Sequence, residues 1–363
     1  MAKYTPNTKE ELQALVKDES IHLGDIDTSK ITDMSELFKN STRTDFSGIE
    51  TWNTSNVETM KGMFWGCESF NQDISKWNTS NVENMADMFT YCENFNQDIS
   101  GWDVSNVETM DSMFTYCKTF NQDISSWDTS NVENMKGMFK GCESFNQDLS
   151  SWDVSKVESM SWMFEDCKTF NQDISKWNTS NVENMASMFS GCHSFNQDLS
   201  SWNVSGVENM DSMFEHCTSF NQDLSSWDVS RVKDMSYMFS GCHSFNQDLS
   251  SWDVSRVKDM SWMFSDCRTF NQNISNWNTS KVESMACMFY DCTSFNQPLG
   301  DWDVSEVKTM AYMFAGCRNF NQDISNWDIN NVNDTDMFEN CPIDNSNKPD
   351  VLQEQSSIKR NKL

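Results

Sequence analysis

The chain has 363 residues, with 55 Asp or Glu against 26 Lys or Arg and a net charge of −29. This excess of negative charge argues against binding to nucleic acid or anionic lipid, because both need positive charge to displace counterions. It is compatible with cations or with a basic partner. No run approaches the ~20 apolar residues of a membrane-spanning helix, and the first residues contain no apolar leader segment. The sequence therefore predicts no membrane span and a cytoplasmic location.

Residues 1–24 precede the repeats and are predicted to form an N-terminal cap. Thr8 is followed three residues later by Glu11, the spacing of a helix capping box. Leu12, Leu15 and Val16 then recur at helical spacing. A solenoid exposes a hydrophobic face at its first unit, so a leading helix is expected to cover it.

Residues 25–341 repeat with a period of 25. Trp recurs in one register from Trp52 to Trp327, and Phe-Asn-Gln recurs from Phe70 to Phe320. A fixed period in this range is typical of repeat proteins whose units stack and share a core. The sequence therefore predicts a single solenoid, expected to be a monomer.

Each repeat is predicted to contain a short helix followed by a strand. Val57, Met60, Phe64 and Cys67 lie three or four residues apart, which favours one face of a helix. The segment 70–75 alternates like a strand, with residues 70, 72 and 74 inward and amide ladders joining neighbouring repeats. The predicted fold class is an α/β repeat, a leucine-rich-repeat-like solenoid of strand–turn–short-helix units.

Eleven cysteines share one repeat position, from Cys67 to Cys317. This placement predicts a column of small buried, reduced side chains and not a disulfide scaffold. Cys287 lies outside the column and is predicted to be a free surface thiol. Residues 342–363 are polar and are predicted to be a disordered tail.

The segment Trp102–Ser125 carries the pattern Trp-Asp-Val-Ser-x-Val-x-x-Met-x-x-Met-Phe-x-x-Cys-x-x-Phe-Asn-Gln-Asp-Ile-Ser. In this pattern the chain resembles the BspA-like leucine-rich-repeat surface proteins, in the branch with a 25-residue repeat first noted in mycoplasmas. The resemblance covers residues 25–341. It implies a leucine-rich-repeat-like solenoid with a surface or interaction role, and it brings no active site or cofactor.

Specificity is expected where the repeats differ, because packing fixes the buried positions. Trp162, Tyr237, Trp262 and Tyr312 share a repeat position on the outer face of the predicted helix. Exposed aromatic residues often mark contact surfaces, so these four are predicted to bind a macromolecular partner. The alternative is that they pack along the stack and cover their neighbours. Basic residues gather nearby, at Arg231, Lys233, Arg256, Lys258 and Arg268.

A column of aspartates offers an alternative function. The column comprises Asp73, Asp98, Asp123, Asp148, Asp173, Asp198, Asp223 and Asp248. Calcium favours clustered carboxylate oxygens, so a cation-binding structural rod is the second hypothesis. The other reading of the column is a set of solvated, hydrogen-bonded turns.

Enzyme signatures are absent from the sequence. The four histidines show no zinc-binding spacing, and phosphate loops and nucleophile elbows are missing. The chain is therefore predicted to be a non-enzymatic interaction scaffold that needs no cofactor.

Overall fold

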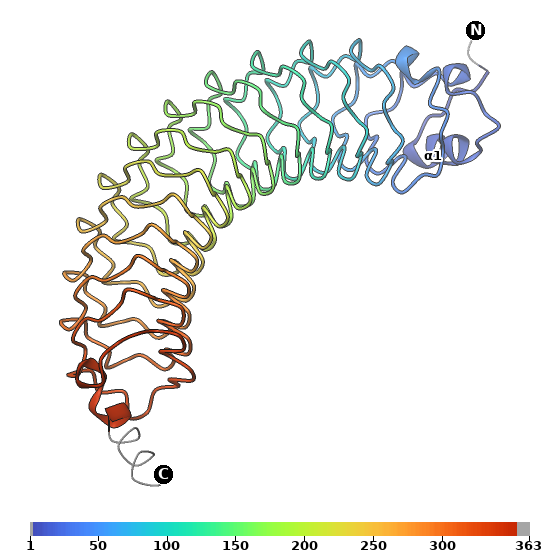
Figure 1. The fold of residues 1–363 in the computed structure, drawn as a ribbon. Helices are drawn as coiled ribbons and strands as arrows, with labels where there is room; N and C mark the ends of the chain where they lie inside the picture. The colour runs from blue at the N-terminus through green and yellow to red at the C-terminus, as the bar shows by residue number, and fades with distance from the viewer. Residues whose placement is uncertain (1–2, 354–363) are drawn as a thin grey trace. The chain divides into compact units, whose positions relative to one another are not determined.

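The computed structural model describes residues 3–353. The chain forms two compact units, Met1–Val182 and Glu183–Leu363. In each unit, successive turns of the chain lie side by side, one repeat per turn (Figure 1). Tandem repeats that stack in this way define a repeat solenoid within each unit.

The predicted N-terminal helix is present as α1, Lys9–Lys17. The Thr8 hydroxyl accepts a hydrogen bond from the Glu11 backbone amide over 3.3 Å, which satisfies one of the free amides at the helix start. Leu12 and Val16 are buried. The chain continues through a 3₁₀ turn, η1 (Leu23–Asp25), and enters the first repeat.

A buried arginine fastens this cap to the first repeat. Arg43 lies between the first two repeats, where the spacing from Ile31 to Val57 is one residue longer than the period, and it is only 4 % exposed. Its guanidinium donates to the backbone carbonyls of Val16 and Asp18 over 3.3 and 3.0 Å. These carbonyls lie at the C-terminal end of α1, where a cation is also favoured by the helix dipole.

The predicted short helices of the repeats are wrong. Within residues 3–353 the repeats contain no regular helix or strand, apart from the 3₁₀ turn η2 (Ile49–Thr51). The backbone amides of Met60, Gly62 and Phe64 donate to carbonyls one repeat further along the chain, over 2.8–2.9 Å. Within the same repeat, the amides of Met63 and Cys67 donate to the carbonyls three residues earlier in the chain. The segment is a run of tight turns joined sideways to its neighbours.

Isolated parallel bridges mark this ladder in both units. In the first unit they join Asp33, Thr59, Asn84, Thr109, Asn134 and Ser159 in succession. In the second unit they join Asn184, Asn209, Asp234, Asp259, Ser284, Thr309 and Asn333.

The helix prediction failed because the spacing of the apolar residues fits two different structures. Consecutive three-residue turns repeat apolar side chains at nearly the same spacing as a helix does. The turns need left-handed backbone, as at Gly62 and Gly66, whose φ angles are 58° and 75°. A left-handed residue cannot continue a right-handed helix. Glycine recurs at the second of these positions, at Gly66, Gly141, Gly191, Gly241 and Gly316, and this recurrence was the signal for turns.

The prediction of a strand at residues 70–75 is also wrong. This segment is joined to its neighbours by side chains: the Asn71 Oδ1 accepts from the Asn96 backbone amide over 2.9 Å and from the Gln97 Nε2 over 3.0 Å. The amide ladder is therefore present. It lies at the surface, because Gln72 is only half-buried and does not point into the core. Phe70 and Ile74 are buried, as predicted.

The core consists of columns of identical side chains. Phe64 stacks on Phe70 and on Phe89 of the next repeat, with ring centroids 3.8 and 5.7 Å apart. In the core column from Trp52 to Trp327, tryptophan indoles donate their Nε1–H to a carbonyl of the preceding repeat, as Trp102 does to Ile74 over 3.1 Å. Every repeat is thus tied to its neighbour by both apolar packing and a buried hydrogen bond.

The cysteine column is buried and free of disulfides within the described residues. The Cys92 thiol donates to the Phe64 carbonyl over 3.1 Å, and its equivalents do the same. Burial raises the pKa of the Cys67 thiol to about 12. The prediction of a column of buried cysteines is confirmed.

The prediction of a disordered tail is wrong for residues 342–353. Ile343 is buried, and a 3₁₀ turn, η3 (Asn345–Asn347), follows it. The Asp344 amide donates to the Asn321 Oδ1 over 2.7 Å, and the Ile324 amide donates to the Asn347 carbonyl over 3.0 Å. This segment continues the amide ladder and covers the end of the last repeat, which its polar composition concealed. The rest of the predicted tail, 354–363, lies outside the described residues.

Candidate functional site

The structure brings three of the four predicted contact residues to consecutive or nearby repeats of the second unit. The backbone amides of Tyr237, Trp262 and Cys287 each donate to a carbonyl of the next repeat, over 2.8–2.9 Å. The Tyr237 and Trp262 rings stack with centroids 5.7 Å apart and planes 5° from parallel. Tyr312 follows Cys287 by one repeat. Tyr237, Trp262, Cys287 and Tyr312 are called the stripe below.

Exposure differs between the four aromatic residues. Trp162 belongs to the first unit and is 38 % exposed, whereas Tyr237, Trp262 and Tyr312 are half-buried. The alternative of packing along the stack therefore holds in part, since Tyr237 and Trp262 cover one another. Both rings still reach solvent.

All four aromatic residues have left-handed backbone. Their φ angles lie between 56° and 60°. Other repeats place glycine at this position, as at Gly62 and Gly137. A bulky side chain is disfavoured in this conformation, because its Cβ approaches the following carbonyl oxygen. The chain therefore carries aromatic side chains where its backbone would favour glycine.

The prediction that Cys287 is a surface thiol is wrong. The residue is only 5 % exposed, and its thiol points at the Ala311 carbonyl, 3.7 Å away. Burial raises the pKa of Cys287 to about 11. Neighbouring large residues of the stripe surround this smaller one, which explains why it is covered.

The basic residues near the stripe are largely paired. Arg231 and Lys233 both contact the Glu208 carboxylate, over 2.9 and 2.5 Å. Lys258 lies 3.5 Å from Glu283 of the next repeat. Such exposed pairs contribute little stability, but they neutralise the cations locally. They do not make a basic patch.

Sequence reasoning missed two half-buried carboxylates beside Tyr237. Burial raises the pKa of Asp211, and it also raises the pKa of Glu215. Burial and the negative charges of Glu215 and Asp211 also raise the pKa of the Tyr237 hydroxyl. A comparison of charges across repeats at these two positions would have revealed them.

A second aromatic pair was also missed. Tyr91 and Tyr116 of the first unit stack with centroids 5.0 Å apart, and Tyr91 is 44 % exposed. The Tyr116 ring lies over Gly141 of the next repeat, where an added Cβ would meet a ring atom at 2.4 Å. The glycine at this position allows the ring to lie flat.

The aspartate column forms turns. Each of its eight carboxylates accepts a hydrogen bond from the backbone amide of the serine two residues later, over 2.8–3.0 Å. The Ser75 backbone amide and then the Ser75 hydroxyl hold the pKa of Asp73 below its usual value. An Asx turn of this kind explains Asp-x-Ser without any ion.

No group of three His, Cys, Asp or Glu side chains in residues 3–353 converges on a point that could hold a metal ion. The column aspartates are engaged one by one, each within its own turn. The geometry therefore gives the calcium hypothesis no coordination site.

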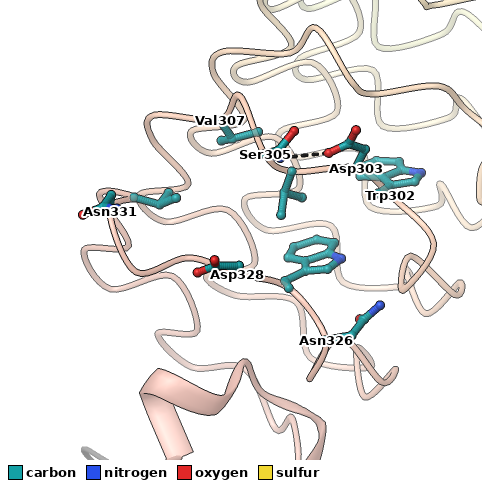
Figure 2. A pocket seen from close by; sticks show the side chains of 10 residues that line it. Trp302, Asp303, Ser305, Val307, Asn326, Asp328 and Asn331 are labelled. Atoms are coloured by element: carbon teal, nitrogen blue, oxygen red, sulfur yellow. Dashed lines mark hydrogen bonds between the residues drawn. The ribbon is translucent and has the colours of Figure 1, made fainter.

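A hollow of about 370 Å³ lies beside the last regular repeat of the second unit (Figure 2). Trp302, Val307 and Trp327 supply apolar walls, and Asp303 and Asp328 line it as well. The Asp303 carboxylate accepts from the Ser305 amide over 3.0 Å, the same turn contact as elsewhere. Its polar groups thus serve the fold, and the hollow marks where the repeat pattern degenerates.

None of the helices within residues 3–353 has the length and apolar character to cross a bilayer. Repeated units with stacked columns of core side chains in each unit define a tandem-repeat solenoid protein. The model of the family described as "Mycoplasma protein of unknown function, DUF285" matches residues 10–118, 97–192, 172–275 and 245–350. The chain belongs to this family.

Other comparisons add little. Among curated proteins there is no match. A chain of the solved "Crystal structure of TLR13-ssRNA13 complex" matches with 12% sequence identity and a TM-score of 0.23, over 92% of this chain and 60% of that one. This chain thus spans 60% of that chain's length, and a match at this TM-score carries no argument about either fold or function.

Proposed function

We propose that this protein is a non-enzymatic scaffold that recognises a macromolecular partner through exposed repeat positions. The contact residues are Trp162, Tyr237, Trp262 and Tyr312. The observation that carries the proposal is the size of these side chains at a repeat position where the chain elsewhere places small or polar residues such as Gly62, Asp87 and Ser187, all with the same left-handed backbone. The fold sets the backbone at this position in every repeat, so it is the exposed aromatic side chains that need another explanation.

The chain itself supplies the comparison. At the same repeat position, Gly62 and Gly137 adopt φ angles of 58° and 60° without a side chain to accommodate. An aromatic residue there opposes folding by about 1–2 kcal/mol. Stacking and partial burial of Tyr237 on Trp262 offset about 0.5–1.5 kcal/mol of this. The aromatic residues therefore bring little net stability, and partner binding accounts for their presence.

The resemblance to BspA-like surface proteins agrees with an interaction role. Aromatic residues are enriched among those that dominate binding energy at interfaces, because they bury a large rigid area. The repeat scaffold holds the stripe in place through backbone hydrogen bonds at every repeat. A preorganised surface loses less entropy on binding than a mobile one.

The test is a cross-linking pull-down from lysate and surface fractions of the source cell. The bait is the full chain, compared with a variant in which Trp162, Tyr237, Trp262 and Tyr312 are replaced by serine. Serine occurs naturally at this position, for example at Ser187. This variant, called the stripe variant, replaces the three aromatic residues of the stripe together with Trp162, and it is expected to remain folded and to lose the partner.

The matched control removes four aromatic residues elsewhere on the surface of the first unit, by serine replacement of Tyr4, Trp65, Tyr91 and Tyr116. It is expected to keep the partner. A partner retained by the stripe variant, or lost equally from both variants, would refute the proposed contact surface.

A further inference from the structure

Trp162 shows which groups pack against an aromatic side chain at this repeat position. Two lysines of the preceding repeat cover its indole: the Lys136 Nζ lies 4.7 Å from the ring centroid and the Lys140 Nζ lies 5.5 Å from it. Both distances are within the range of a cation–π interaction. Lys140 also pairs with Glu165 over 2.6 Å. At Trp162, two lysines of the same chain thus supply the cations that lie over the aromatic ring.

Tyr237 occupies the same repeat position with the charges reversed. The residues that correspond to Lys136 and Lys140 in the repeat before Tyr237 are Asp211 and Glu215. The Asp211 carboxylate accepts a hydrogen bond from the hydroxyl of Ser236, which precedes Tyr237 in the chain, and Glu215 holds the repeat position of Lys140, which lies over Trp162. The site around Tyr237 thus has an aromatic ring and two negative groups, but it lacks the two lysines that cover Trp162.

Neither carboxylate is neutralised by lysine or arginine in the described part of the chain. Asp211 accepts from the hydroxyls of Ser212 and Ser236, over 3.1 and 3.0 Å. Glu215 has the His216 ring 3.8 Å away and the Ser190 hydroxyl at 3.5 Å. Hydroxyls satisfy hydrogen-bonding capacity but leave the charge uncompensated.

The nearby cations are already engaged. Arg231 and Lys233 pair with Glu208, as described above. Around Tyr237, Asp259 adds a third negative charge that acts on its hydroxyl. On its other side the tyrosine ring stacks on Trp262. A positively charged group from outside would complete this arrangement.

We propose that Asp211, Glu215 and the Tyr237–Trp262 pair form a site for an organic cation, namely a lysine or arginine side chain of the protein partner. This inference rests on the proposed function, which it deepens by naming the chemistry of the partner. The aromatic pair would contact the alkyl stem and the cation, and the carboxylates would accept its hydrogen bonds. The net charge of −29 would speed the approach of a basic partner.

The probe is a fluorescein-labelled tetralysine peptide, with binding measured by anisotropy at about 0.15 M salt, where long-range surface attraction is screened. A tetra-arginine peptide tests the second cation, and a tetraglutamate peptide is the negative control. The key variant is D211K/E215K. It reproduces the Lys136/Lys140 arrangement, which the fold already accommodates, and should supply the ring with internal cations.

The matched control is E83K/E108K, which makes the same change in net charge at exposed positions of the first unit. Lysine occurs naturally at this repeat position, at Lys233 and Lys258. A third variant, D211S/E215S, uses residues found at these positions in other repeats. This third variant shows whether a loss of binding by D211K/E215K comes from the lost carboxylates or from a folding defect caused by the lysines.

Tetralysine is expected to bind the wild type and the E83K/E108K control with similar affinity. D211K/E215K and D211S/E215S should both weaken binding at least tenfold relative to that control. The variant Y237S/W262S should weaken binding roughly threefold to tenfold, as expected for loss of a cation–π contact. Binding of tetraglutamate by the wild type would overturn the proposal.

Equal affinity of D211K/E215K and E83K/E108K for tetralysine would also overturn it, as would absence of binding to the wild type. The pull-down described above tests the proposed function independently of these peptide measurements. If the pull-down partner still depends on the stripe while tetralysine does not depend on Asp211 and Glu215, the scaffold stands and the cation site falls.

Discussion

Replacing Trp152 by alanine tests how the repeats hold together. The side chain is 3 % exposed, stacks on Trp127 with centroids 6.3 Å apart, and packs against Phe139. Its Nε1–H donates to the Ile124 carbonyl of the preceding repeat over 3.1 Å. Truncation of a buried tryptophan to alanine typically lowers the free energy of unfolding by 3–5 kcal/mol. We expect a loss of about 4 kcal/mol.

Trp152→Phe separates packing from the hydrogen bond. Phenylalanine keeps most of the apolar ring and removes the donor. The Ile124 carbonyl also accepts from the Trp127 backbone amide over 3.2 Å, so it is not left without a partner. The expected loss is therefore about 1 kcal/mol.

The assay is urea denaturation followed by far-ultraviolet circular dichroism, with the free energy of unfolding extrapolated to water for each variant. A matched exposed control is Trp162→Ala, which removes an indole outside the core and should shift the midpoint much less. An unchanged midpoint for Trp152→Ala would mean that the indole column does not join the repeats. Equal losses for the alanine and phenylalanine variants would mean that the hydrogen bond, and not apolar burial, dominates.

Three further predictions concern backbone, pH and ions. Ser187→Gly should raise the free energy of unfolding by about 0.5–1 kcal/mol in the same assay, because Ser187 has a φ angle of 54° and glycine adopts this conformation without strain. On acidification from pH 7.5 the melting temperature should first rise, because burial raises the pKa of Asp211 and of Glu215 and protonation then favours the folded state. Below about pH 4 it should fall, because carboxylates such as Asp73 have a lowered folded-state pKa and their stabilisation is lost as they protonate. D211S/E215S should show a smaller initial rise, since burial also raises the pKa of Asp87, which this variant keeps. Adding EDTA or calcium should leave the melting temperature unchanged, and a chelator-dependent drop reversed by calcium would restore the cation-rod hypothesis.

The repeat period and the buried columns could be predicted because stacking places identical residues on top of one another. Phe70, Ile74 and the cysteine column all take the core positions expected of them. The helical cap also followed from local chemistry, since Thr8 and Glu11 are short-range signals. What sequence periodicity could not separate was a helix from a run of three-residue turns.

The candidate site was only partly predictable. Comparing repeats identified the stripe position, because aromatic residues vary there while the core stays constant. It did not reveal that this position is left-handed, although Gly62 and Gly137 carried that information. Asp211 and Glu215 escaped notice because the chain is acidic throughout, so two more carboxylates did not stand out.

The structure divides the carboxylates into two groups with different explanations. Those like Asp73 and Asp303 accept from the backbone amide of the residue two places later, and the turn they cap explains their presence. Asp211 and Glu215 accept only side-chain hydroxyl contacts and cap no such turn. Burial opposes their ionisation and the fold gains no turn from them, so folding alone does not account for these two residues. The cation site that we propose beside Tyr237 would account for both.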